Sequence, residues 1–344
     1  KSSAWTPLPS GDGQRLAIRA QSDGLYYQSY SASFTEPWLG GRKPNSLSIS
    51  IYNSIQTNGE KKGSENRQSI NILGASVGLG RRLKWPDDYF TLYNGLTYQN
   101  YTLNNFSSVF SFSNGYSNCL NLTNVISRNS IDQPIYPRSG SEISLTIQLT
   151  PPFSILKNIN YKNATDQEKY KWIEYHKWKF STSSFIKLYD NFVLNTKTQF
   201  GFLALYNRNI GMAPFERFYL GGDGMYGYAL DGREIIALRG YTNNSLSPST
   251  GGTIYAKYTA ELRYPLSLNP ATTIYLLTFV EAGDSWTKFN QFNPFSVHRS
   301  AGIGVRLFLP MFQLGLDWGY GFDEVKGNPS ANKGQFHFTI APPY

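Results

Sequence analysis

The chain has 344 residues, of which 16% are charged and 16% aromatic, and its formal net charge is +9. Soluble proteins carry roughly 25% charged residues, and helical membrane proteins need about 20 consecutive apolar residues per span, so the composition fits neither class. Abundant aromatic residues exclude a disordered chain. No run of Lys and Arg is longer than two residues, so we expect no nucleic-acid partner.

Residues that would carry covalent chemistry are few. A single cysteine, Cys119, excludes an intramolecular disulfide, and the three histidines are too scattered to suggest a metal site. The sequence has no recognisable pairing of a nucleophile with a base. We therefore expect no catalytic residues, no metal and no cofactor, and predict that the protein is not an enzyme.

Apolar and polar residues alternate along nearly the whole chain. Leu47, Ile49 and Ile51, for example, alternate with serines. Successive residues of a strand point to opposite faces, so each such segment has one apolar and one polar face. In chain order, the expected strands span residues 14–24, 27–36, 45–56, 70–83, 90–101, 118–129, 140–150, 177–189, 192–206, 214–221, 252–264, 272–282, 300–309, 312–322 and 334–341.

This pattern predicts an all-β fold, either a soluble antiparallel sheet with one wet face or a membrane barrel. No segment has the helical period needed to cover a sheet, and the polar faces are rich in glycine and small residues. We therefore predict a transmembrane antiparallel up-and-down β-barrel whose apolar face contacts lipid. Bacterial barrels normally have an even number of strands, so we expect 16 strands in the full protein, about 15 of them here and the first upstream of Lys1.

The connections between the strands are short at one rim and long at the other, as in outer-membrane barrels. Part of one long connection, residues 166–173, is expected to form a short helix. We expect residues 1–344 to form one barrel domain, integral to the bacterial outer membrane. The long connections span residues 57–69, 102–117, 151–176, 222–251 and 283–299.

A strand ending in Gly221-Gly222 leads to the tripeptide Arg239-Gly240-Tyr241 in the long 222–251 loop. This arrangement resembles the sixth loop of the BamA family, the barrel subunits of the outer-membrane β-barrel assembly machinery. The segments that support the resemblance are Tyr136-Pro137-Arg138-Ser139-Gly140, residues 279–286 and the last hairpin at 302–322. The family carries periplasmic POTRA modules before the barrel, so the resemblance implies such modules upstream of this chain.

The sequence departs from the family at three places. Leu238 and Tyr241 stand where Val and Phe are commoner, and the chain ends in Ala-Pro-Pro-Tyr instead of a terminal Phe or Trp. The resemblance still implies a factor that folds and inserts β-barrel proteins into the outer membrane without covalent chemistry. The implied partners are unfolded barrel clients, an accessory lipoprotein or other machinery subunits, and outer-membrane lipids with lipopolysaccharide. The alternative function is a protein-translocating or solute pore gated by the 222–251 loop.

Two acidic residues on neighbouring expected strands should face the lumen. Glu261 shares a strand face with Lys257, and Glu281 has the opposite parity to Val280. A charge facing lipid would cost several kcal/mol, so both carboxylates are expected to point inward. Arg239 is a suitable counter-charge because its planar guanidinium can bind carboxylates. Spacing alone leaves open the alternative that the side chains of Arg239, Glu261 and Glu281 are solvated separately. The resemblance implies instead that Arg239, Gly240 and Tyr241 dock in the lumen against Glu261 and Glu281.

The last expected strand is short, and it forms one side of a candidate seam, the place where the first and last strands of a closed barrel meet. Pro342 and Pro343 have no N–H group, so the ladder should stop near Ala341. We predict a weak seam that opens laterally, so that the first strand, upstream of this chain, templates a client strand. A fully paired seam with a frayed tail is the alternative. The seam residues are Gly334, Phe336, Phe338 and Ile340.

Overall fold

The structure is a computed structural model that describes residues 13–41, 45–107, 109–156, 161–212, 215–225 and 230–341. Within these ranges, fourteen strands form one sheet in the order β1-β2-β3-β4-β5-β6-β7-β8-β9-β12-β13-β14-β15-β16. No helix in these ranges is long and apolar enough to cross a membrane. The chain forms two compact units, the first of residues 1–126, 146–177 and 204–213, and the second of residues 127–145, 178–203 and 214–344.

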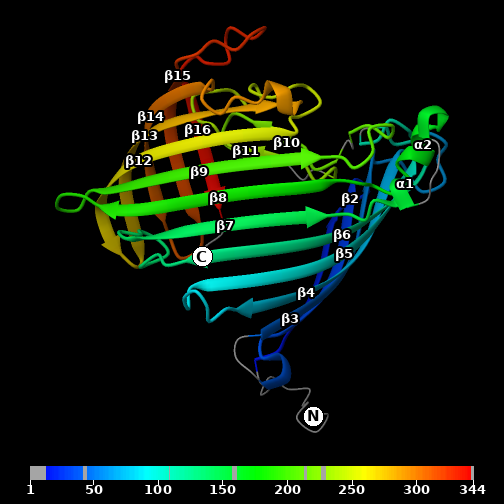
Figure 1. Cartoon of the computed structure of the whole chain (residues 1–344), viewed down its shortest axis with the longest axis horizontal. Coiled ribbons are helices and arrows are strands. Elements are labelled where there is room, and N and C mark those ends of the chain that lie inside the picture. The colour runs from blue at the N-terminus through cyan, green and yellow to red at the C-terminus, as the bar shows by residue number, and fades with distance from the viewer. Residues whose placement is uncertain are drawn as a thin grey trace. The chain divides into compact units, whose positions relative to one another are not determined.

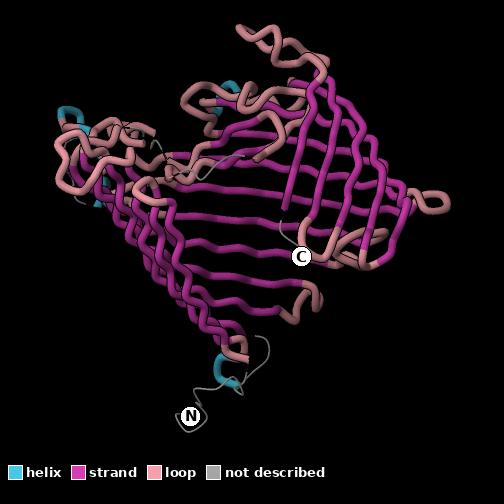
Figure 2. Tube along the Cα trace, turned by 180° about the vertical axis from the view of Figure 1, so that it is seen from behind, coloured by secondary structure: helices cyan, strands magenta, loops and turns pink. Residues whose placement is uncertain are grey.

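The first unit is built on antiparallel strands joined in sequence order (Figure 2). Ile49 and Ile51 on one face are exposed, whereas Ser50 between them hydrogen-bonds Ser76 on the other face at 2.7 Å. An apolar exposed face and a hydrogen-bonded polar face are what a lipid-facing wall requires. The elements are β1 (Arg15–Asp23), β2 (Tyr27–Glu36), η2 (Leu39–Gly41), β3 (Asn45–Thr57), β4 (Ser69–Arg82), β5 (Phe90–Asn104) and β6 (Gly115–Asn129), whose last residues belong to the second unit.

The long connection after β7 (Gly140–Leu149) contains α1 (Phe153–Leu156), η3 (Tyr161–Asn163) and α2 (Asp166–Lys169). A capping box between Thr165 and Glu168 starts α2, as expected near residue 166. The helix ends at Lys169, earlier than predicted, because the chain then pairs with Asn118 of β6. The backbone N–H of Asn118 donates to Lys171 O at 2.9 Å, and Ile173 N donates to Asn118 O at 2.8 Å.

Glu174 should make the stability of this connection depend on pH. Its carboxylate accepts hydrogen bonds from the backbone N–H and hydroxyl of Ser154, at 2.5 and 2.7 Å. Burial raises the pKa of Glu174, and the hydrogen bonds from Ser154 partly offset the rise. A carboxyl whose pKa is higher in the folded state stabilises the fold most when protonated, so its contribution falls as pH rises through that pKa.

We therefore expect residues 150–176 to resist proteolysis better at about pH 5 than at about pH 7.5. Glu174→Gln keeps the hydrogen-bonding shape without the titration and should abolish the difference. Limited proteolysis followed by mass spectrometry measures it. An identical pH profile in the native chain and in Glu174→Gln would show that another group is responsible.

The second unit contains the first six residues of β7 and the strands from β8 to the end of the described chain, except for the first two residues of β8 and the last residue of β9 (Figure 1). On β13, Tyr275, Leu277 and Phe279 are buried, whereas the alternate residues Leu276 and Val280 are exposed. We call the buried face of these strands the inner face and the exposed apolar face the outer face. The elements are β8 (His176–Lys187), β9 (Val193–Ala204), β12 (Ile254–Asn269), β13 (Thr272–Trp286), η4 (Phe289–Gln291), β14 (His298–Phe308), β15 (Gln313–Gly321) and β16 (Gln335–Ala341).

One expected strand does not belong to the sheet. The described part of this segment, residues 215–221, contains only the short β10 (Phe218–Leu220), which pairs in parallel with β11 (Glu234–Ile236) inside the long loop between β9 and β12. Gly221 and Gly222 turn the chain with φ of 122° and 81°, and a Cβ on Gly221 would lie 2.6 Å from Thr242 O. The prediction of a sheet strand here was wrong, and the other fourteen segments each match one strand of the sheet. The count of 16 for the full protein stays a prediction.

Candidate functional site

The side chain of Arg239 contacts three carboxylates on the inner face of the second unit. Its Nη2 atom lies 2.7 Å from Glu261 Oε1 and 2.8 Å from Glu281 Oε1, and its Nη1 atom lies 3.3 Å from Asp317 Oδ1. The backbone N–H of Arg239 also donates to Glu281 Oε2 at 2.8 Å. The guanidinium carbon lies 3.6 Å from the centroid of the Phe279 ring, so charge pairing and a cation–π contact hold the same group.

The positions of these acids follow from strand register. Glu261 on β12 pairs with Phe279 on β13, and Glu281 lies two residues further along β13 on the same face. The two carboxylates are therefore diagonal neighbours, and Phe279 provides an apolar surface beside them. Asp317 reaches the same place from β15. Arg239 comes from the long loop, so a loop residue is bound by three separate strands.

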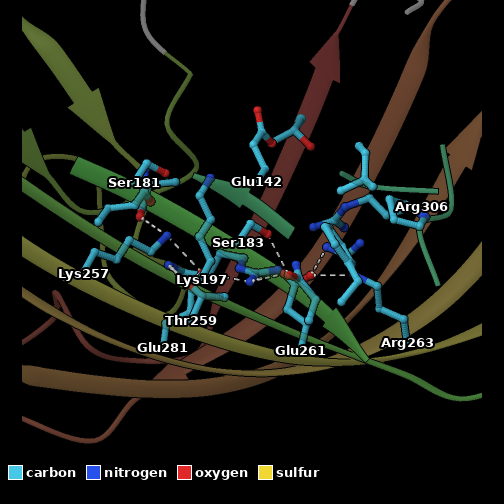
Figure 3. A pocket seen from close by; sticks show the side chains of 18 of the residues that line it. Glu142, Ser181, Ser183, Lys197, Lys257, Thr259, Glu261, Arg263, Glu281 and Arg306 are labelled. Carbon is cyan, nitrogen blue, oxygen red and sulfur yellow. Dashed lines mark hydrogen bonds and ion pairs between the residues drawn. The ribbon is translucent and has the colours of Figure 1, made fainter. Parts of the chain in front are cut away.

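Each of the three acids has a second basic partner; Figure 3 labels Glu261 with Arg263 and Glu281 with Lys257. Arg263 Nη2 lies 2.5 Å from Glu261 Oε2, and Lys257 Nζ lies 3.0 Å from Glu281 Oε1. Arg306 binds both oxygens of Asp317, at 2.9 and 2.8 Å. Three acids and four bases thus form one buried network, which satisfies the charges that burial would otherwise make costly.

Gly240 lies directly on the backbone of β15. Its φ is 87°, and a Cβ on Gly240 would lie 2.9 Å from Tyr320 C. On the strand side, a Cβ on Gly319 would lie 2.7 Å from Gly240 N. The Gly240 N–H donates to His337 Nε2 on β16 at 2.8 Å, so that nitrogen is unprotonated and the ring is neutral. Glycines on both sides therefore allow the loop and the strand to touch.

Tyr241 completes the docked tripeptide. Its hydroxyl donates to Arg299 O at 2.8 Å, and burial raises its pKa to about 12, so it remains a donor at neutral pH. The next residue, Thr242, donates its N–H to Ala331 O in the β15–β16 connection at 2.9 Å. The tripeptide predicted from sequence is thus held by side chains and backbone of β12–β16 and their connections.

A polar cavity of about 730 Å³ adjoins the network within the second unit. Glu142 and Lys197 line it together with Arg239 and its partners (Figure 3). Within the described ranges, no group of three or more His, Cys, Asp or Glu side chains is arranged to hold a metal ion.

The seam residues lie on or beside β16. Phe336, Phe338 and Ile340 are exposed on the outer face. Gly334 precedes the strand, and a Cβ there would lie 3.1 Å from the Trp318 ring, so this position adjoins a packed side chain. All seven residues of β16 pair with β15. Pro342 and Pro343, which should end the ladder, lie outside the described residues.

Sequence reasoning missed several contributors to the site, among them Asp317, Arg306, His337 and Gly319. Asp317 and His337 stand at polar positions of alternating segments, which places them on the inner face. Alternation of apolar and polar residues predicts which face of the sheet a side chain occupies. It does not predict which strands a distant loop will contact. Gly319 has no side chain, so no sequence pattern distinguishes it from a glycine that merely weakens a strand.

The antiparallel all-β fold is that of an outer-membrane barrel, and a family comparison agrees. Residues 10–341 match the model of the Omp85 superfamily domain, so the chain belongs to the Omp85 superfamily. Members are non-enzymatic barrels for protein assembly or translocation in the bacterial outer membrane. The sequence-based predictions of an all-β barrel fold and of an outer-membrane location are therefore confirmed.

Two solved structures are similar in fold. BamA from Haemophilus ducreyi lacking POTRA domains 1–3 has a TM-score of 0.67 and 19% identity, covering 96% of this chain and 64% of that chain. CdiB from Escherichia coli has a TM-score of 0.53 and 13% identity, covering 92% of this chain and 53% of that one. The chain thus spans less than two thirds of the length of either. No curated protein matches the sequence.

Proposed function

We propose that this chain is the barrel domain of an outer-membrane protein assembly factor of the BamA type, which folds and inserts β-barrel clients without covalent chemistry. The observation that supports this most is the docking of Arg239 on Glu261, Glu281 and Asp317. These contacts fix a loop to β12, β13 and β15, and the Gly240 hydrogen bond extends the contact to β16. The docked loop acts as an internal brace for the strands nearest the seam.

The brace stabilises the sheet near β16, the last strand of the described chain, which is short. This strand has 7 residues, against 15 in β13, and it ends the sheet order. In lipid, the unpaired N–H and C=O groups of a strand edge are costly, so an incoming strand that pairs with them is favoured. We propose that the seam beside Gly334, Phe336, Phe338 and Ile340 opens laterally and admits the client's last strand.

The partners follow from this function. They are unfolded outer-membrane barrel proteins, upstream periplasmic modules and an accessory lipoprotein or other machinery subunits, together with outer-membrane lipids and lipopolysaccharide. The loop 222–251 stays in place as a brace in this scheme. In a pore, the same loop would instead move as a gate of the polar cavity beside it.

The full-length protein in liposomes distinguishes these two functions. An assembly factor should accelerate the folding of a urea-denatured client barrel, measured by its heat-modifiable migration on gels, and give small, erratic currents in planar bilayers. Large steady currents, with client folding no faster than in empty liposomes, would contradict the proposal and favour the pore.

A further inference from the structure

The connection between β13 and β14, residues 287–297, contains three phenylalanines at intervals of three, Phe289, Phe292 and Phe295, and one charged residue, Lys288. Phe295 is 91% exposed, more than any other large apolar side chain in the described part of the chain, and Phe289 is 73% exposed. Isolated exposed apolar residues are normal on a protein surface, but neighbouring aromatic ones indicate an interaction surface.

The connection packs against the outer face of the sheet. Ile254 on β12 pairs with Phe202 on β9 and with Trp286 on β13. Trp286 has the same strand parity as the exposed Val280, so this row of three belongs to the outer face. Ile254 is nevertheless only 4% exposed, which means that other atoms cover the row.

The cover is provided by the aromatic residues of the connection. The ring of Phe292 lies 5.6 Å from that of Phe202 and 5.0 Å from that of Trp286, measured between centroids. Phe289 extends the cluster, with its ring 6.1 Å from Phe292 and 6.5 Å from Phe202. The inner face at the same level is covered differently, because Phe218 of the long loop packs on Tyr255 with centroids 4.7 Å apart. The β9–β12 loop therefore folds over the inner face, whereas the β13–β14 connection folds over the outer face.

Turns within the connection fix the exposed rings. Gln291 N donates to Lys288 O at 3.0 Å, and Phe292 N donates to Phe289 O at 3.1 Å, which closes η4. Phe295 N donates to the side chain of Asn293 at 3.1 Å. The rings of Phe289 and Phe295 are thus presented by an ordered backbone.

We propose that residues 287–297 form an interfacial anchor that lies in the head-group zone of the membrane. The occupant of this surface is lipid, because the connection continues the lipid-facing wall of a membrane-spanning strand just where that strand ends. Aromatic rings with a nearby lysine suit this zone, where one side of a residue is apolar and the other wet. The anchor fixes how deep β13, whose inner face carries Glu281, lies in the membrane. This inference does not depend on the proposed function of the barrel.

Fluorescence from single labels tests the anchor in the complete protein. Cys119 is replaced by alanine, and a nitrobenzoxadiazole probe is attached to Phe289→Cys or to Phe295→Cys. Val280→Cys, six residues before Trp286 on the outer face, reports the membrane interior, and Ser330→Cys, exposed in the β15–β16 connection, reports water. Heat-modifiable migration verifies that each labelled protein is folded.

The proteins are placed in phosphatidylethanolamine–phosphatidylglycerol vesicles containing a lipid spin label, either near the head group or near the end of an acyl chain. We expect blue-shifted emission at positions 289 and 295, with stronger quenching by the shallow spin label, and stronger quenching by the deep one at position 280. Emission and quenching equal to those at position 330 would overturn the proposal and assign the surface to a protein partner or a second copy. Stronger quenching by the deep label at 289 and 295 would also overturn it.

Discussion

Arg239→Ala is expected to loosen the 222–251 loop and to lower the stability of the folded barrel in detergent. The guanidinium contacts Glu261, Glu281 and Asp317, whose side chains are 8%, 2% and 2% exposed. Each acid keeps its second basic partner, but the change removes the charge-assisted hydrogen bonds of the guanidinium. Such bonds are worth about 1.5–3 kcal/mol each, so we expect a total loss of about 3 kcal/mol or more. Protease should cut the loop faster, and the temperature at which the protein loses its folded gel mobility should fall.

Arg299→Ala is the matched control for this change. Arg299 also pairs with a carboxylate, Asp323, at 2.8 Å, but its side chain is 63% exposed, so solvent screens the pair and the loss should be small. Arg239→Lys should lie between the two, since it keeps the charge but not the planar fork. Equal loop cleavage and equal thermal stability in Arg239→Ala and Arg299→Ala would show that the cluster does not hold the loop.

Gly319→Ala is expected to disrupt the docking from the strand side without touching any charge. The added Cβ would lie 2.7 Å from Gly240 N and 3.0 Å from Gly240 Cα, and neither backbone atom can rotate away. Overpacking of this kind costs about 1–3 kcal/mol. The loop should become accessible to protease although all the charged residues are intact.

The control for this change is Gly334→Ala, which also lies beside β15. The three atoms nearest to its Cβ would all belong to the Trp318 ring, at 3.1 to 3.4 Å, and none to the loop. Because Gly319 and Arg239 act on the same docked segment, the double variant Gly319→Ala/Arg239→Ala should lose less stability than the sum of the single losses. Strict additivity, measured by denaturation in detergent, would mean that the two residues act independently.

Strand alternation predicted most of this fold because every sheet strand has one lipid-facing and one inner face. The segment at 214–221 misled this reasoning, since the aromatic Phe218 and the apolar Leu220 are buried in a loop core and not in the wall. Strand parity also placed Glu261 and Glu281 on the inner face, since a charge is costly in lipid.

What sequence could not supply was the contact between elements distant in the chain. Asp317 is a polar residue at an inner position, but only the register of β15 brings it within 3.3 Å of Arg239. Trp286 was recognisable as an aromatic at a strand end, yet nothing in the pattern indicated that Phe292 would fold back onto it. Both contacts depend on loop paths, which local periodicity does not determine.

The proposal that the docked loop is needed for client assembly is tested most directly by measuring client folding with the loop released. The folding of a urea-denatured barrel client in liposomes would be followed with the full-length protein, with Arg239→Ala, with Arg299→Ala and without protein. We predict clear acceleration by the native protein and by Arg299→Ala, and loss of most of this acceleration in Arg239→Ala. Acceleration by Arg239→Ala equal to that of the native protein, with the loop shown by protease to be released, would contradict this proposal.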